Sequence, residues 1–346
     1  MRGILPLIVA LAGFGGAGAE TLPRFPPQAT WYADVSQAPL RSNSAEMLQW
    51  LEQQGGWGTN DASHPDRFQI DFSLVVLHAD AASPTAPLVE QPGYYLPDCD
   101  GVQPVPLPFG GRIEGSGDYT CNIGDEDCHL LVVRDGSLYE SYNTTVDAVG
   151  VHSLCLAVWN LRVVYPPEGR GDGCTSADAA GFPIAPLLIN ADEVAGAIAD
   201  DGDLGHAIRF ILPNARMRAG YYVRPASHIG GPGSADQLSI PYGSRLRLKA
   251  GFDISGFNPA AQAVLRTLKK YGMVLADGGN VPLTADADTY TSAQWSDLDF
   301  DSHSLFGVRP SDFEIIDTGA LIPTQDCERS DPTPVDPIFA DGFGDQ

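Results

Sequence analysis

Positive charge is scarce in this chain of 346 residues. Twenty lysines and arginines stand against 44 aspartates and glutamates, which gives a formal net charge of -24 at pH 7. Proteins that bind nucleic acid through its phosphates need a basic surface, so the composition argues against a nucleic-acid partner. The same acidic balance is typical of a soluble exported protein, since a net charge far from zero favours solubility.

The sequence motifs of several enzyme classes are also absent. No GxSxG elbow, Walker A loop or helix-opening GxGxxG occurs, which argues against an α/β-hydrolase, a P-loop NTPase and a dinucleotide-binding enzyme. No CxxC or HExxH spacing occurs either, so we predict no metal and no cofactor. Beyond the N-terminus, no segment reaches about 18 uninterrupted apolar residues, and we predict no membrane span.

The first residues are typical of a secretory signal. Arg2 precedes an apolar run that ends in Ala17-Gly18-Ala19, a pattern of small residues that favours signal cleavage. We therefore predict a signal peptide over residues 1–19 and a secreted protein, either extracellular or periplasmic.

The six cysteines form an even set in a chain that we expect to be exported. Three disulfides are then the expected arrangement, and their pairing stays open from spacing alone. Cys121 and Cys128 could close a small loop, and Cys327 could tether the C-terminal region. A fully paired set would leave no cysteine nucleophile.

Glycine and proline are abundant, at 38 and 28 residues, and fit frequent turns between short strands. Strand-like runs occur at 68–80, 129–133, 138–142, 154–165, 206–212, 220–225 and 244–253. We predict a mainly β fold, an antiparallel two-sheet sandwich of jelly-roll type with a few peripheral helices, and a β-barrel is the alternative.

We expect a single β-rich domain over residues 20–328. It would comprise an N-terminal extension (20–65) and a core (66–320), followed by a disordered C-terminal tail (329–346).

Two local structures are predicted by turn and cap residues. Asp135-Gly136 lies between two strand-like runs and predicts a β-hairpin. Asn258 and Pro259 suit the start of a helix, and Gly272 suits its end.

The scarce cations are concentrated in residues 206–270. This segment holds ten of the lysines and arginines, including all three lysines, against two acids. Strand alternation would place Arg245, Arg247 and Lys249 on one side and the intervening leucines on the other. Such a row could line a groove for an anionic ligand, or it could pair with the excess carboxylates on a solvated face.

Two carboxylates are candidates for acid/base catalysis, because glycosidic hydrolysis needs a pair of them. Glu140 lies mid-strand between aromatic neighbours, where burial would raise its pKa as a general acid requires. Asp178 lies in a loop of small residues that a ligand could approach closely. Ordinary surface and turn roles are the alternatives.

Substrate contacts are predicted for cations, histidines and one tyrosine near these strands, with an acid at the end of the basic strand. Arginine suits carboxylate groups and an aromatic ring suits a sugar face. The residues are His129, His206, Arg209, Tyr222, Arg224, His228, Arg247, Lys249 and Asp253. Two alternatives stay open: Tyr222 or His228 could act as the base of an elimination, and the three histidines could ligate a metal.

Two stretches resemble known proteins. The terminal "PIFADGFGD" is similar to a short tail on exported gammaproteobacterial proteins. Residues 125–280, from "HLLVV" through "GCTSADAAGFPIAP" to "LKKYGMVLADGG", resemble a broad group of secreted bacterial proteins that often accompany polysaccharide-handling modules.

Together these features predict a secreted carbohydrate-active enzyme that hydrolyses an extracellular polysaccharide, and the concentrated cations would suit an anionic one. The alternatives are a polysaccharide lyase that acts on uronate-containing glycans and a non-catalytic glycan-binding or adhesion protein.

Overall fold

The computed structural model describes residues 21–58, 63, 66–101, 104–121, 127–231 and 233–330, and the backbone of Thr333–Pro334. The predicted signal peptide, residues 1–19, lies outside the described residues. None of the helices in the described part of the chain has both the length and the apolar character that crossing a bilayer requires.

The larger half of the molecule, here called the large lobe, is built on a six-stranded sheet. Its order is β1-β17-β12-β16-β15-β18. The strands are β1 (Ile70–Leu74), β17 (Leu283–Asp286), β12 (Ile208–Leu212), β16 (Met273–Gly278), β15 (Arg245–Leu248) and β18 (Phe313–Ile315). The central strands β12 and β16 run parallel, whereas β15 is antiparallel to both of its neighbours. Because parallel strands end at the same edge, the ends of β12 and β16 lie together.

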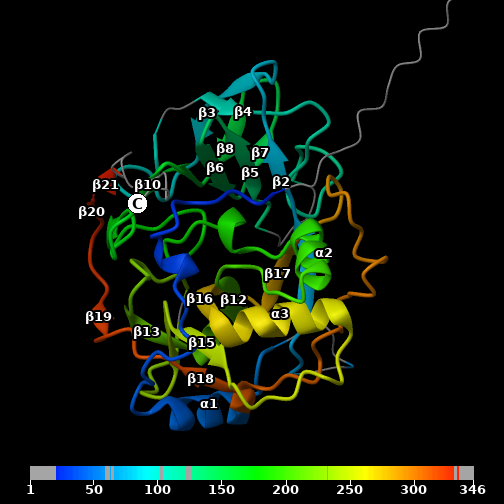
Figure 1. Cartoon of the computed structure of the whole chain (residues 1–346). Coiled ribbons are helices and arrows are strands. Elements are labelled where there is room, and N and C mark those ends of the chain that lie inside the picture. Colours follow the sequence, from blue (N-terminus) through cyan, green and yellow to red (C-terminus); the bar gives the residue numbers. More distant parts are fainter. Residues whose placement is uncertain are drawn as a thin grey trace, which may run out of the picture.

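Three α-helices occur within the described residues, and all belong to the large lobe. They are α1 (Ser44–Gln53), α2 (Ala191–Ala199) and α3 (Pro259–Lys270). The predicted cap of α3 is confirmed, because the Asn258 side chain accepts a hydrogen bond from the Ala261 N–H. Figure 1 shows α3 lying across strands β12, β16 and β15. The short 3-10 helices are η1 (Thr30–Tyr32), η2 (Ala185–Leu187), η3 (Asn214–Arg216) and η4 (Pro310–Asp312).

The smaller half, here called the small lobe, contains two four-stranded sheets ordered β2-β5-β6-β9 and β4-β3-β8-β7. The first comprises β2 (Val76–His78), β5 (Leu130–Arg134), β6 (Ser137–Tyr142) and β9 (Cys155–Asn160). The second comprises β4 (Pro104–Pro106), β3 (Thr85–Glu90), β8 (Val151–Ser153) and β7 (Thr145–Val146). The predicted hairpin is confirmed: β5 and β6 pair around Asp135 and Gly136, which both have positive φ.

The C-terminal segment runs along one side of both lobes, as the red trace in Figure 1 shows. It contributes strands to three minor sheets, β14-β13-β19, β11-β20 and β10-β21. The C-terminal segment supplies β19 (Ile322–Pro323), β20 (Glu328–Arg329) and β21 (Thr333–Pro334). Earlier parts of the chain supply their partners β13 (Met217–Tyr222), β14 (Ile240–Tyr242), β11 (Gly171–Asp172) and β10 (Val163–Val164). The predicted tail, 329–346, therefore begins in paired strands, and 335–346 lie outside the described residues.

Three disulfides join the six cysteines: Cys99–Cys155, Cys121–Cys128 and Cys174–Cys327. The expectation of three disulfides is confirmed, and both suggested uses are found, a small closed loop and a tether for the C-terminal segment. Such cross-links restrict the unfolded chain and are typical of oxidising compartments.

Two clusters of buried apolar side chains form the core. The larger one fills the large lobe and reaches into the small lobe through Leu131, Leu138 and Trp159. The smaller one lies within the small lobe, around Val105, Leu130 and Val151. The lobes thus share one continuous core, and the small lobe has a second core of its own.

The prediction of a mainly β chain with a few helices is confirmed. The sheets differ from the predicted jelly roll, because β12 and β16 pair in parallel and so do β1 and β17. The strand orders of the described residues are open, and no sheet closes into the alternative barrel. Residues 20–65 also do more than extend the core: α1 and the segment before it pack on it directly.

Candidate functional site

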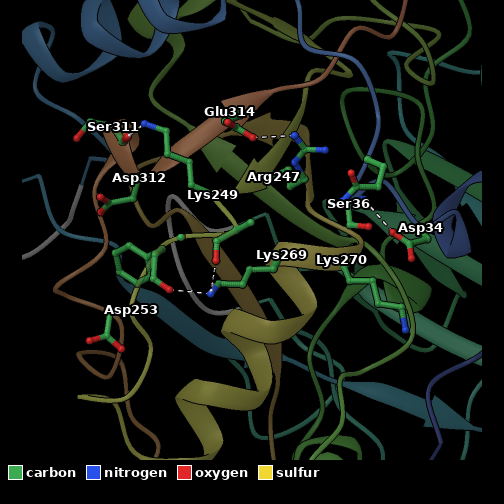
Figure 2. A pocket seen from close by; sticks show the side chains of 14 residues that line it. Asp34, Ser36, Arg247, Lys249, Asp253, Lys269, Lys270, Ser311, Asp312 and Glu314 are labelled. Carbon is green, nitrogen blue, oxygen red and sulfur yellow. Dashed lines mark hydrogen bonds and ion pairs between the residues drawn. The ribbon is translucent and has the colours of Figure 1, made fainter.

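One hollow gathers the cations that the sequence singled out. This lysine pocket, shown in Figure 2, has a volume of about 960 Å³. It lies where the end of β15, the end of α3, η4 and the segment before α1 meet. Its charged lining residues are Arg247, Lys249, Lys269, Lys270, Asp34, Asp253, Asp312 and Glu314. The predicted binding residues Arg247, Lys249 and Asp253 therefore do share one hollow, but four acids balance its four cations.

The lysines of this pocket already have protein partners. Lys249 Nζ donates to the Ser311 carbonyl oxygen at 2.6 Å, and Lys269 Nζ donates to the Phe252 carbonyl oxygen at 2.7 Å. Lys270 Nζ lies 3.0 Å from Asp203 Oδ2. Figure 2 shows Lys249 and Lys269 turned toward the backbone that surrounds them.

The basic row on β15 is mainly a structural device. Arg245 and Arg247 are both more than nine-tenths buried. Arg245 donates through Nη1, Nη2 and Nε to the carbonyl oxygens of Thr30, Ala33 and Tyr271, respectively, at 2.7–3.1 Å. Buried backbone carbonyls need such donors. The row therefore fastens residues 30–38 to the sheet.

Arg247 completes this fastening. It donates to the carbonyl oxygens of Val35 and Ala38 and forms a 2.7 Å ion pair with Glu314. A guanidinium has five donors in a fixed fork, which suits several carbonyls of an irregular segment at once.

The predicted catalytic acid Glu140 is completely buried in the small lobe. Its carboxylate accepts hydrogen bonds from the backbone N–H groups of Ile184 and Ala185, both at 2.8 Å, and from Trp159 Nε1 at 3.0 Å. Burial raises its pKa to about 7, against the effect of these donors. Because three protein donors occupy both oxygens, this carboxylate holds the start of η2 against β6.

Three further predicted residues lie outside both the lysine pocket and the surroundings of Glu140: His206 by itself, and Tyr222 together with Arg224. His206 is buried, donates through Nδ1 to the Ala207 carbonyl oxygen at 2.8 Å and has its pKa lowered by burial. Tyr222 and Arg224 both bind Asp172, through a 2.9 Å contact of the phenol and a 2.8 Å contact of Arg224 Nη2. This group holds β11 against β13 and leaves little freedom for a ligand.

A second hollow lies between the lobes, at the edge where β12 and β16 end. This aspartate–tyrosine pocket has a volume of about 210 Å³. Its side chains come from the small lobe, the large lobe and the loop between them. Its polar lining residues are Tyr94, Asp127, Tyr142, Thr175, Ser176, Asn214, His228, Tyr242 and Asp277. Ligands of open sheets with parallel strands bind preferentially at the carboxyl ends of those strands.

Two carboxylates reach this pocket, and one of them has a raised pKa. Asp277, at the end of β16, keeps 21% of its side chain exposed. Protein surrounds the rest, so desolvation raises the pKa of Asp277; Arg209 opposes the shift, and the negative charge of Asp127 adds to it. A carboxyl group of raised pKa beside a second carboxyl group is an arrangement that acid/base catalysis uses.

Backbone groups fix the position of Asp277. Its Oδ1 accepts a hydrogen bond from the Gly278 N–H at 2.7 Å. A Cβ atom at position 278 would lie only 2.3 Å from Asn214 Oδ1, so a larger residue there would require the Asn214 side chain to move.

A buried ion pair lies directly behind Asp277. Arg209 Nε donates to Asp178 Oδ2 at 3.0 Å, and Arg209 Nη2 lies 4.0 Å from Asp277 Oδ2. Asp178 is completely buried, and desolvation raises its pKa to about 7 although Arg209 opposes the shift. Of the predicted residues, Asp178 and Arg209 thus lie next to the pocket and behind its wall.

His129 supports the same wall as an imidazolium. Its Nδ1 lies 2.7 Å from Glu114 Oε2 and its Nε2 lies 3.1 Å from the Ala177 carbonyl oxygen. Both partners accept only, so both ring nitrogens must carry hydrogen. Burial alone would lower the pKa of His129, but Glu114 outweighs it and raises the pKa to about 9. Ala177 lines the pocket, so this contact positions the loop.

His228 is the one predicted binding residue that lines the aspartate–tyrosine pocket. Its Nδ1 donates to the Ala179 carbonyl oxygen at 2.8 Å. Burial lowers its pKa, so the ring is neutral and its Nε2 is an acceptor. Tyr94, 45% exposed, presents an aromatic surface to the same pocket.

The sequence reasoning missed Asp277 and Asp127, the two acids that meet in this pocket. A sequence feature could have singled out each of them. Asp277 comes at the end of an apolar strand and precedes two glycines, and Asp127 is adjacent to a disulfide cysteine. The alternative of a metal bound by His129, His206 and His228 finds no support, since the described residues contain no group of three or more suitable ligands.

Comparison of the chain with protein-family models, curated proteins and solved structures finds no match. The site must therefore be interpreted from its own geometry.

Proposed function

We propose that this chain is a secreted glycoside hydrolase whose catalytic centre is the aspartate–tyrosine pocket. The observation that carries the proposal is the meeting of Asp277 and Asp127 at one hollow, with desolvation and the charge of Asp127 both raising the pKa of Asp277. In this assignment Asp277 replaces Glu140 as the acid, and Asp178 becomes a supporting residue.

The reaction divides between the two carboxyl groups. As the general acid, Asp277 donates a proton to the glycosidic oxygen as the bond to the anomeric carbon breaks. As the general base, Asp127 takes a proton from the water that attacks that carbon. One water is consumed and two hydroxyl groups result, and a proton transfer between Asp127 and Asp277 through solvent restores the enzyme.

The remaining lining suits a sugar. Tyr94 and Tyr142 offer aromatic surfaces on which a sugar ring can stack, and aromatic side chains combine large apolar area with a polar end. Asn214, His228 and the hydroxyl groups of Thr175 and Ser176 offer donors and acceptors for sugar hydroxyl groups. A few placed polar groups on an aromatic lining are typical of small-ligand pockets.

Hydrolysis is favoured over elimination by the charge of the pocket. A lyase needs a cation to neutralise the uronate carboxylate before a base removes the adjacent proton. The described lining of the pocket contains neither lysine nor arginine. Arg209, whose Nη2 lies 4.0 Å from Asp277 Oδ2, is buried and bonded to Asp178 and Thr284.

Secretion rests on two features. The N-terminal residues have a signal-like composition, and the described structure holds three disulfides. Both fit a protein that acts on glycans outside the cytoplasm.

The test is a cleavage assay on a panel of polysaccharides with the purified protein. New reducing ends without absorbance from unsaturated uronates are expected, and Asp277→Asn and Asp127→Asn should each abolish them while glycan binding persists. Unsaturated products would establish elimination instead. Retention of glycan without any product would establish a binding protein, and full activity in both variants would remove the proposed catalytic pair.

A further inference from the structure

The described lining of the aspartate–tyrosine pocket contains one buried polar atom without a protein partner, and a second such atom lies behind the pocket wall. The Tyr242 hydroxyl and Asp178 Oδ1 have no hydrogen-bond partner among the residues that the structure describes. Tyr242 is 2% exposed and Asp178 is completely buried. Buried polar atoms are nearly always paired, so each such atom needs an explanation.

Only the hydroxyl group of Tyr242 is at the pocket surface. Tyr242 lines the pocket from β14, whereas Asp178 is buried behind its chain neighbours Ala177 and Ala179, which line it. Burial is the largest cause that raises the pKa of the Tyr242 hydroxyl, and the nearby carboxyl groups of Asp277 and Asp178 add to it. The phenol therefore stays protonated and remains a donor at neutral pH.

We propose that Tyr242 forms a subsite that binds a hydroxyl group of an uncharged sugar unit, with the Tyr242 hydroxyl as donor. A sugar hydroxyl group can accept this hydrogen bond and still donate one to another group of the pocket. This inference rests on the proposed function, because the subsite lies beside the carboxyl pair assigned there.

The charge of the pocket sets the class of sugar. Asp127 and Asp277 face the ligand, and the described lining contains no lysine or arginine that could bind an acidic group. A uronate carboxylate would lose its hydration here and meet negative charge without a compensating cation. The structure therefore argues against the anionic polysaccharide that the basic segment suggested, since those cations lie in the lysine pocket and in buried ion pairs.

Tyr242→Phe tests the subsite in two ways, and Tyr222→Phe is the matched control. In the free protein Tyr242→Phe removes an unpaired buried hydroxyl group, so the melting temperature should rise by roughly 2 °C or more. Tyr222 donates to Asp172, so Tyr222→Phe should lower the melting temperature. With laminarin, xylan and mannan as probes, Tyr242→Phe should reduce kcat/KM or binding about tenfold on the glycan that the wild type uses.

The outcomes separate the two proposals. Cleavage that Tyr242→Phe leaves unchanged would overturn the subsite and keep the hydrolase. Binding of an uncharged glycan without cleavage, weakened by Tyr242→Phe, would keep the subsite and overturn the hydrolase. A fall in melting temperature equal to that of Tyr222→Phe would overturn the subsite, and a preference for polygalacturonate over the uncharged probes would overturn the assigned sugar class. Failure to bind any probe would overturn both.

Discussion

The two pockets of this protein hold similar numbers of polar side chains and differ in what those side chains contact. In the lysine pocket the ammonium and guanidinium groups bind carbonyl oxygens and acids of the surrounding chain. In the aspartate–tyrosine pocket, Tyr242 and the adjacent Asp178 keep atoms without a protein partner. Charge that is already bonded stabilises a fold, whereas unpaired polar atoms at a hollow are available to a ligand.

There is a physical reason why the cation-rich segment does not form the proposed site. The chain concentrates its cations in 206–270, but strands and loops of that segment face irregular backbone that needs donors. Buried carbonyls without partners would cost more than most surface ion pairs gain. The row of arginines on β15 and the candidate binding site are therefore different features of this protein.

The largest expected difference between the pockets is in catalysis. Asp277→Asn removes the proton donor and should lower the rate of glycan cleavage about a thousandfold, within the range for general acids. Asp312→Asn makes the same change in the lysine pocket, where Asp312 accepts a hydrogen bond from the Arg309 N–H, and should change the rate less than about twofold. Initial rates of reducing-end release measure both. Equal losses in the two variants would contradict the comparison.

The disulfide beside Asp127 should affect both rate and stability. Replacing Cys121 and Cys128 by serine opens a loop of sequence separation 7, which should cost roughly 2 kcal/mol of unfolding free energy. It also frees the backbone next to Asp127, so we expect the cleavage rate to fall at least tenfold at a temperature where the variant is folded. Denaturant unfolding and steady-state rates measure the two effects. A stable variant with an unchanged rate would show that the disulfide does not position Asp127.

Arg247→Ala should lower the stability of the fold without lowering the cleavage rate. It removes the side-chain donor of the Ala38 carbonyl oxygen, one of two donors of the Val35 carbonyl oxygen, which keeps the Ala38 N–H, and the partner of Glu314. We expect a destabilisation of about 2–4 kcal/mol, since several buried polar groups lose their bonds together. The rate per folded molecule should stay the same. A specific loss of substrate affinity would return this arginine to the binding site.

The pH dependence of stability should identify His129. Its folded pKa of about 9 lies above the ordinary value near 6.5, so its contribution to stability is complete below that ordinary value and is lost as pH rises through about 9. The contribution is at most about 3 kcal/mol. His129→Gln should abolish most of this loss between pH 7 and 10, as measured by urea unfolding. An unchanged pH profile in the variant would mean that His129 is neutral in the folded protein.

The smallest expected effect is that of Lys249→Ala. The ammonium group contacts one backbone carbonyl oxygen and lies at an exposed position, so the variant should lose less than about 1 kcal/mol and keep its activity. Thermal unfolding and the cleavage assay check this. A tenfold loss of affinity for any glycan would make the lysine pocket a binding site after all.

Several local structures could be predicted from the sequence because short-range chemistry fixes them. Asn258 and Pro259 start α3, and two residues with positive φ, Asp135 and Gly136, turn the hairpin between β5 and β6. The even number of cysteines indicated three disulfides. Strand pairing was different: which strands pair in parallel depends on connections of many residues, which local patterns do not encode.

The candidate site was predicted only in part. Asp178, Arg209, His129 and His228 do gather at or behind one pocket, whereas Glu140 lies elsewhere under η2. The pair Asp127 and Asp277 was missed because the two residues are distant in sequence and each resembles an ordinary turn or strand-end acid on its own.

Taken alone, the sequence determined the composition, the helix caps, the hairpin turn and the number of disulfides, all of which depend on neighbours a few residues apart. The tertiary structure decided which charged groups bond to the protein's own backbone and which line the candidate site. Only in the folded chain does an acid lie beside a second acid, or an arginine beside an unpaired carbonyl oxygen. Short-range preferences survive in any context, but the energy of a charged or polar group depends on the water it loses and the partners it gains.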